Sequence, residues 1–272
     1  MFVIFPVLQT LYISFLSPSG EFVGLENYYD VLGSKDIVNL EGFPKYPPLG
    51  AMIHNLIWIA IHLPLSLFAG LALAIILRDV KGASVVKSVI FLGMVTPLIV
   101  GGIMLRFTFD GQVGILNGFL NFLGFGELAR TWTAYPETAL FAEVFGGVWL
   151  WTGFSMILYS AGLATIPKDY YEAAKIDGAS PFRTFFRITL PLLKPVTLVI
   201  VTMTVLWELK IFDLVYIVNK VGGPGKSTTV LALEMWSRFV YRYYNEAAVI
   251  ATFLTLLTLV VAVGMTRYMV KK

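Results

Sequence analysis

Ionisable side chains that could do chemistry are few in the long apolar stretches of this 272-residue sequence. His54 and His62 lie eight residues apart in an apolar stretch without Asp or Glu, so a metal site there lacks an acidic ligand. Asp213 is the only Asp in these stretches, which excludes a paired-Asp catalytic site, and the chain has no cysteine. The sequence therefore predicts no catalytic residues and no metal site, and the two histidines are interpreted as structural or interface residues.

The glycine-rich stretch GGPGKSTT at 222–229 resembles a phosphate-binding loop only at its end. A phosphate-binding loop has a glycine, then any four residues, then Gly-Lys followed by Ser or Thr. Gly225 precedes Lys226 here, but the required position holds Lys220, and no buried strand comes before it. We therefore expect a Gly/Pro turn between two apolar segments and no nucleotide site in this chain.

A further set of ionisable residues indicates a solute path. Glu208, Lys210 and Asp213 fall in the apolar stretch 195–218, where a charge costs about 2.5–3.5 kcal/mol unless it faces a cavity or a partner. On a continuous helix, Lys210 and Asp213 lie three residues apart and can pair, whereas Glu208 points elsewhere. Aromatic rings interleaved with hydrogen-bonding groups suit a sugar, whose CH groups stack on rings. The alternative is that these groups contact another subunit or hold helices together.

The composition places these residues in a membrane protein. Apolar residues make up 57% of the chain, charged residues make up 14%, and the mean hydropathy is +0.78. A soluble domain cannot bury so much apolar surface, which excludes an ordinary cytosolic enzyme, a disordered chain and a nucleic-acid-binding protein. We expect one all-α membrane domain over 1–272 with six transmembrane helices. The expected spans are 1–16, 51–77, 88–105, 138–164, 195–218 and 247–266.

The first of these spans is short. Sixteen residues form about 24 Å of helix, less than the roughly 30 Å of a membrane core, so we expect a truncated or wrongly assigned start. The distribution of basic residues predicts the orientation, because cytoplasmic loops carry an excess of Lys and Arg. We expect both termini and the segments 78–87 and 165–194 on the cytoplasmic side. Their basic residues are Arg78, Lys81, Lys87, Lys168, Lys175, Arg183, Arg187, Lys194, Arg267, Lys271 and Lys272.

The segment 165–194 has the clearest helix signals. Pro167 suits the first turn of a helix, and Gly178 suits its end. Ser180 followed by Pro181 is typical of an N-cap and the first residue of a second helix. We therefore expect a helix, a tight turn and a second helix at the cytoplasmic face. The alternative is a basic loop that merely follows the charge rule.

The same segment carries a spaced motif, Glu172-Ala173-Ala174, then Gly178, Ile188 and Leu190-Pro191. In these residues the sequence resembles the permeases of binding-protein-dependent ABC importers, in which this is the E-A-A motif. The neighbouring residues are similar to the carbohydrate-uptake permeases of the maltose and glycerol-phosphate type. FVGLENY at 22–28, NLIW at 55–58 and GGPGKSTT at 222–229 also resemble that family.

The resemblance implies a type I ABC importer permease in the cytoplasmic (inner) membrane of a prokaryote. The partners it implies are a second related permease, an extracytoplasmic solute-binding protein, and a cytoplasmic ATPase dimer that binds ATP and Mg²⁺. No cofactor is then expected in this chain. The helix with Glu172 is expected to dock on the ATPase and transmit its closure. The coupling residues implied are Glu172, Ala173, Ala174, Asp177, Gly178, Ile188, Leu190 and Pro191.

The resemblance also carries over a set of residues that line the translocation path. These are Trp149, Phe154, Glu208, Lys210 and Phe212, with Asp213 beside them. An alternative function is a self-sufficient secondary transporter or channel, which would need an internal repeat or broken helices around an ion site. An intramembrane enzyme is a third possibility and would need a catalytic set within the spans. The transporter or channel leaves the segment 165–194 unexplained, and the enzyme lacks its catalytic set, because Asp213 is the only Asp in the spans and the two histidines have no acidic partner.

Overall fold

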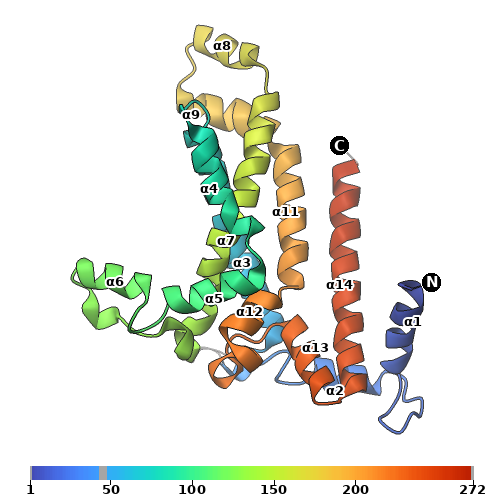
Figure 1. The fold of residues 1–272 in the computed structure, drawn as a ribbon. Helices are drawn as coiled ribbons and strands as arrows, with labels where there is room; N and C mark the ends of the chain where they lie inside the picture. The colour runs from blue at the N-terminus through green and yellow to red at the C-terminus, as the bar shows by residue number, and fades with distance from the viewer. Residues whose placement is uncertain (1, 43–47, 271–272) are drawn as a thin grey trace.

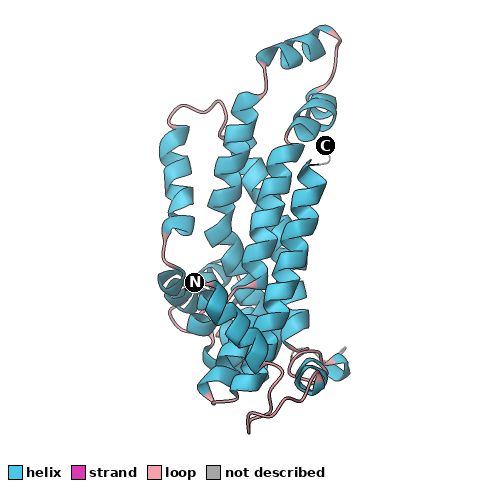
Figure 2. Ribbon diagram, turned by 90° about the vertical axis from the view of Figure 1, so that its right-hand side faces the viewer, coloured by secondary structure: helices cyan, strands magenta, loops and turns pink. Residues whose placement is uncertain are grey.

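The computed structural model of the protein describes residues 2–42 and 48–270, and these residues form helices joined by turns (Figures 1 and 2). Within that part of the chain there is no strand, only an isolated antiparallel bridge between Leu16 and Phe22. Lys271 and Lys272, which contributed to the charge argument, lie outside the described residues, as does Met1 of the first expected span.

Three long helices confirm three of the expected spans. They are α3 (Ala51–Ile76), α7 (Pro136–Thr165) and α14 (Tyr244–Val270), and each is long and apolar enough to cross a membrane. Helices α3 and α7 cross closely, since a Cβ at Gly70 would lie 2.4 Å from the Cβ of Ser155. Small residues at such a crossing let two membrane helices approach each other.

The expected span 88–105 is wrong as a single straight helix. Helix α4 (Ala83–Val95) and helix α5 (Leu98–Thr108) meet at a bend of 101°. The break falls at Thr96, which is extended (ψ 128°), and at Pro97, which has no backbone N–H to continue the helix. The second part therefore turns across the end of the bundle, as Figure 1 shows.

The expected span 195–218 is also interrupted. Helix α11 (Lys194–Leu209) ends before Lys210, and helix α12 (Asp213–Val218) begins after Phe212, whose φ of −141° and ψ of −61° are not helical. Lys210 and Asp213 therefore do not share one helical face. Among the described residues no ion pair joins them, so the predicted pairing is wrong.

The two ends of the bundle differ. Helices α8 (Lys168–Ile176) and α9 (Pro181–Thr184) lie at the same end as the C-terminal end of α14 (Figure 1). Helices α12, α13 (Leu231–Val240) and α2 (Glu26–Leu32) lie at the other end, and α6 (Ile115–Phe122) projects sideways.

The remaining turns of helix are η1 (Leu40–Gly42), η2 (Gly126–Leu128), η3 (Trp132–Ala134), η4 (Phe185–Thr189, a π-helix), α10 (Leu190–Leu192), η5 (Lys220–Gly222) and η6 (Pro224–Lys226).

The described residues give three to five candidate spans, so the six that were expected are not confirmed. Three helices are long and apolar enough, and the number becomes five if each bent pair counts as one span. The second bent pair joins Pro181–Leu192 to α11 at 63°. Helix α1 (Ile4–Ile13) is a shorter apolar helix of ten residues, in agreement with the weakness of the first expected span.

Candidate coupling segment and solute path

The turn between α8 and α9 has the predicted geometry. Gly178 adopts a left-handed conformation, with φ of +70°. Its N–H donates to the carbonyl of Lys175 at 3.1 Å, and the N–H of Ala179 donates to the carbonyl of Ala174 at 2.9 Å. These two bonds satisfy carbonyls at the end of α8 and form a Schellman motif, which favours glycine at the left-handed position.

Helix α9 begins as the sequence predicts. The hydroxyl of Ser180 accepts a hydrogen bond from the backbone N–H of Arg183 at 3.3 Å, and Pro181 occupies the first helical position. Because both helix ends are specified by local residues, the orientation of α8 relative to α9 follows from the sequence of this segment.

The residues of the E-A-A motif point in different directions on α8. Glu172 and Ala173 are exposed, whereas Ala174 is only 6% exposed and packs against its own chain. Ile176, at the end of the helix, is 86% exposed. Asp177 and Gly178 are also exposed. The helix therefore offers a mixed apolar and acidic surface at the end of the molecule.

The other face of α8 is attached to the bundle through Tyr171. The guanidinium of Arg78, just beyond α3, lies 4.9 Å from the centre of the Tyr171 ring. The Tyr171 hydroxyl is 3.3 Å from the hydroxyl of Thr189 in the π-helix η4. The remaining motif residues follow along this path: Ile188 and Leu190 are half-buried and Pro191 is exposed. Tyr171 thus connects α8 to two separate parts of the bundle.

A row of buried polar side chains on α3 holds the broken fifth segment. Asn55 donates to the carbonyl of Glu208 at 2.8 Å and accepts from the N–H of Leu231 at 2.9 Å. His54 Nδ1 lies 2.7 Å from the carbonyl of Thr229, and its Nε2 accepts from the N–H of Leu49 at 3.0 Å. These bonds attach the last turn of α11, the first residue of α13 and the residue Thr229 before it to α3.

His62 belongs to the same row and pairs with Glu208. The two side chains are fully buried, and His62 Nδ1 lies 2.6 Å from the carboxylate of Glu208. Sequence reasoning missed this pair because the partner comes from a different helix, and a search within one apolar stretch cannot find it. Residues 2–42 and 48–270 contain no group of three His, Cys, Asp or Glu that could hold a metal ion.

The six residues expected to line a path are not all in one place. Glu208 is buried against His62, whereas Lys210 and Asp213 are exposed on either side of the half-buried Phe212. Phe154 joins a ring cluster, since it lies 5.1 Å from Trp151. Trp149 is 48% exposed on α7. The structure brings together Lys210 and Phe212 at one cavity, and leaves Trp149 apart from it.

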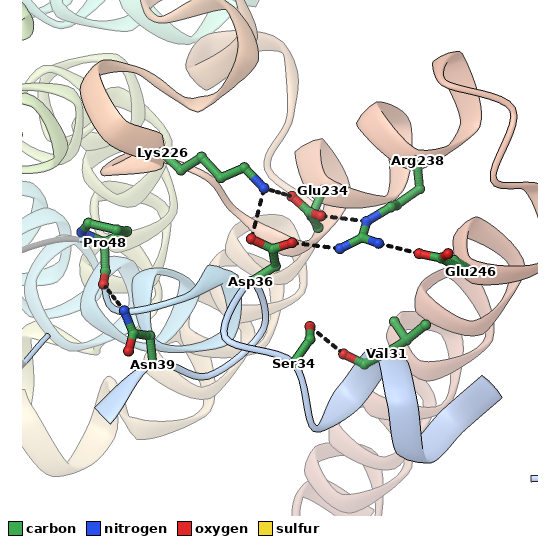
Figure 3. Close-up of polar contacts among 9 residues, drawn as sticks. All are labelled: Val31, Ser34, Asp36, Asn39, Pro48, Lys226, Glu234, Arg238 and Glu246. Carbon is green, nitrogen blue, oxygen red and sulfur yellow. Dashed lines mark hydrogen bonds and ion pairs between the residues drawn. The ribbon is translucent and has the colours of Figure 1, made fainter. Parts of the chain in front are cut away.

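An ion cluster ties together four segments: the loop with Asp36, η6, α13 and α14 (Figure 3). It lies at the end of the bundle opposite α8 (Figure 1). The Arg238 guanidinium on α13 donates to Glu234 at 2.7 Å and to Asp36 at 2.6 Å, and also to Glu246 on α14. Lys226 donates to Asp36 at 2.8 Å. Burial alone lowers the pKa of Arg238, but the hydrogen bond that it donates to Glu234 and the charges of Glu234, Glu246 and Asp36 raise it above its ordinary value. Arg238 therefore stays charged and closes the cluster.

We expect Arg238→Met to destabilise the protein by roughly 2 kcal/mol, because Glu234 is almost fully buried and loses its nearest cation. The measurement is the midpoint of thermal unfolding in detergent. Lys35→Met is the matched control, since Lys35 pairs with Glu41 on the exposed surface, where such a pair contributes about 0–1 kcal/mol. Equal midpoints for the two variants would contradict the role of the cluster.

Comparison with protein families and with individual proteins identifies the family and the fold. Residues 63–272 match the family described as binding-protein-dependent transport system inner membrane component. The chain belongs to this family. The permease is also 57% identical, over 265 residues, to a probable ABC transporter permease protein of Pyrococcus horikoshii, covering 96% of this chain and 90% of that protein. The chain is therefore the permease of an ATP-driven importer, and α8 with its E-A-A motif lies within the matched region.

More distant relatives support the same assignment. The permease is 34% identical over 251 residues to the trehalose/maltose transport system permease protein of Thermococcus litoralis, covering 90% of this chain and 79% of that protein. Among solved structures, a bacterial ABC transporter that imports alginate matches with a TM-score of 0.80 at 19% identity. That match covers 99% of the permease and 90% of the other chain, and shows that the two share a fold.

Proposed function

We propose that this permease forms half of the translocation path for a sugar and transmits ATP-driven closure from a separate ATPase. The observation that carries the proposal is the geometry of α8, with Glu172 and Ala173 exposed on one face and Tyr171 held by Arg78 and Thr189. A helix exposed in this way, at the end of a membrane bundle, suits docking into a groove of a partner.

The proposed partners are a second related permease, a cytoplasmic ATPase dimer that binds ATP and Mg²⁺, and an extracytoplasmic solute-binding protein. The family description supports the last of these, because its systems depend on a binding protein. Of two solved neighbours at 18–19% identity, one is an alginate transporter in complex with a periplasmic protein. A transporter or channel that works alone is not favoured by this family assignment.

The proposed orientation puts α8 in the cytoplasm. The C-terminal end of α14 lies at the same end of the bundle as α8 (Figure 1), which supports a cytoplasmic C-terminus. The proposed cytoplasmic N-terminus requires a sixth crossing element in addition to the five obtained when both bent pairs are counted, and the ten-residue apolar helix α1 is the proposed part of it. The membrane is then the cytoplasmic (inner) membrane of a prokaryote, crossed several times.

The proposed substrate is a sugar. Relatives that support it are the trehalose/maltose permease and the lactose permease of Rhizobium radiobacter, the latter 29% identical over 266 residues. Rings and hydrogen-bonding groups along the broken fifth segment agree with such a substrate, because sugars present CH faces and hydroxyls together. The proposed path residues are Trp149, Phe154, Glu208, Lys210, Phe212 and Asp213.

The test is purification of the permease from its native membrane in mild detergent, followed by sugar uptake in liposomes. We expect an ATPase and a second permease to co-purify, and uptake to require ATP. Glu172→Lys should reduce co-purified ATPase and uptake at least tenfold. The exposed carboxylate of Glu172 is proposed to face a basic groove of the ATPase, and a lysine there would be repelled by that groove. Lys175→Glu, also exposed on α8, is the control for a general change of charge.

Two results would contradict the proposal. Uptake without ATP by the purified permease alone would favour a self-sufficient transporter. If the Glu172→Lys variant still co-purifies with the ATPase and still takes up sugar, α8 does not couple the permease to the ATPase through this residue.

A further inference from the structure

A cavity of about 300 Å³ lies between α8, the end of α3 and the segment α9–η4, at the end of the bundle that carries α8 (Figure 1). Its polar walls come from Arg78, Tyr171, Lys175, Thr184 and Thr189, and the rest of its lining is apolar. None of the described residues that line it is acidic. None of them belongs to the coupling motif or to the proposed solute path, so the cavity has no role in the proposed function.

Two cations line this cavity without a counterion. Among the residues that the structure describes, neither Arg78 nor Lys175 takes part in an ion pair. Lys175 follows Tyr171 by four residues on α8, so the two side chains share one face of the helix. Both cations are exposed, so a ligand from the solvent can reach them. The cavity therefore favours an anion.

Arg78 is held in a way that leaves its hydrogen-bond donors free. Its guanidinium lies over the Tyr171 ring, 4.9 Å from the centre of that ring. This contact uses a face of the guanidinium, whereas its five N–H donors lie in its plane and match the oxygens of a phosphate group. The contact with Tyr171 thus fixes the position of the donors before a ligand arrives.

The hydroxyl groups of Tyr171 and Thr189 supply a further donor. Their oxygens are 3.3 Å apart, so one hydroxyl donates to the other. Each hydroxyl has one proton, and this bond uses only one of the two protons. Within the described part of the chain, neither hydroxyl has another hydrogen-bond partner. One O–H at the wall of the cavity is therefore left for a ligand.

We propose that this cavity binds a phosphate group, held by Arg78 at the end of α3 and by Lys175 on α8. Guanidinium forms paired bonds with phosphate oxygens, and the ammonium group adds a point charge. The volume lies at the lower end of the roughly 300–1,000 Å³ of small-molecule sites, so a phosphate with a small organic group fits. A free phosphate ester and the headgroup of an anionic lipid both present such a group.

A bound phosphate would join α8 to α3 through a second link, in addition to the contact between Tyr171 and Arg78. The inference goes beyond the proposed function, because it concerns the inner face of the coupling helix and holds for any transported solute.

The first experiment measures the binding of radiolabelled inorganic phosphate to the full-length permease in phosphate-free detergent. The ATPase is left out because it binds phosphate groups of its own. We expect Arg78→Gln and Lys175→Gln each to weaken binding about tenfold or more through loss of a charged donor. Lys175→Arg should stay within about threefold of the wild type, because it keeps the charge. Phosphate should also slow hydrogen exchange of the α8 amides.

Lys168→Gln is the matched control, because it removes an exposed lysine from the same helix but not from the cavity. Equal phosphate affinities in Lys168→Gln, Arg78→Gln and Lys175→Gln would overturn the site, since no specific residue would then hold the anion. Slower exchange of α8 on addition of phosphate to Lys175→Gln would overturn it as well.

A second experiment distinguishes the two sources of the phosphate group by measuring exchange of α8 in lipid nanodiscs. Slow exchange in phosphatidylglycerol without added phosphate, absent in phosphatidylcholine and lost in Lys175→Gln, would assign the cavity to a lipid headgroup. Slow exchange in either lipid only after phosphate is added would assign it to a free phosphate ester. Exchange that neither probe changes would overturn the site.

The complete importer provides a further test. Lys175 shares the face of α8 that Tyr171 attaches to the bundle, so Lys175→Gln should still co-purify with the ATPase. Loss of the ATPase from this variant would overturn the phosphate site by assigning Lys175 to a subunit interface. It would leave the proposed import function intact, since the coupling helix would then contact the ATPase through both faces.

Discussion

Replacing Asn55 with leucine is expected to destabilise the permease by about 1–3 kcal/mol. Its amide holds the carbonyl of Glu208 and the N–H of Leu231, and a leucine would leave the buried N–H of Leu231 without a partner at about 1–3 kcal/mol, while the carbonyl would keep only the 3.4 Å bond from the N–H of Ile211. Helix α11 would then be tied to α3 at this point only through His62 and Glu208, and the start of α13 only through His54 and Thr229. The measurement is the midpoint of thermal unfolding in detergent, followed by size-exclusion chromatography.

Thr202→Val is the matched control for Asn55→Leu. Thr202 is also buried, but its hydroxyl bonds only to the carbonyl of Leu198 in its own helix. Valine has a similar shape, so this substitution breaks no contact between two segments. We expect a much smaller shift of the midpoint for this control. Equal shifts in the two variants would show that the row of polar residues on α3 does not hold the interruption.

Gly178→Val is expected to abolish coupling while the bundle stays folded. Gly178 has φ of +70°, a conformation that costs an L-residue roughly 1–2 kcal/mol and costs a β-branched residue more. A Cβ at this position meets no atom within 4 Å, so the effect comes from the backbone and not from a collision. Because the turn sets the direction of α8, we expect at least a tenfold loss of ATP-driven uptake, with no larger fall of the unfolding midpoint than the same strain produces in a turn away from α8.

The chain contains a matched control and a rescue for this prediction. Gly124, after α6, has φ of +83°, open space around its Cβ position and the same pair of capping bonds, but it lies away from the coupling segment. Gly124→Val should strain its own turn equally and leave uptake intact. Gly178→Asn should retain uptake, since Asn tolerates the left-handed region. If both glycine-to-valine variants transport equally well, the turn at Gly178 has no special role in coupling.

Much of the coupling segment could be predicted from the sequence because its signals are local. Gly178 ends one helix and Ser180 begins the next through bonds that span only a few residues, and the structure confirms both. The sequence could not show that two neighbouring residues of the motif differ in burial, with Ala173 exposed and Ala174 buried. That difference depends on which face of α8 the rest of the chain covers.

The predictions of continuous helices at 88–105 and 195–218 were wrong for different reasons. The bend at Thr96–Pro97 had a sequence signal, because a residue before proline avoids the helical region, but a continuous apolar run concealed it. The interruption at Lys210–Phe212 has neither proline nor glycine. The structure places Asn55 and His62, from a helix about 150 positions earlier, against Glu208 at this point. No pattern within 195–218 could have predicted it.

The sequence by itself determined that the chain is helical, that it belongs in a membrane, and that the segment 165–194 forms a helix, a tight turn and a second helix. These properties follow from composition and from contacts between near neighbours, which the order of residues specifies directly. Only the tertiary structure decided that Glu208 pairs with His62, that Lys210 is separated from Asp213, and that Trp236 of α13 joins Phe212 at a cavity. These arrangements depend on contacts between helices far apart in the chain, and helix periodicity says which face is apolar but not which partner covers it.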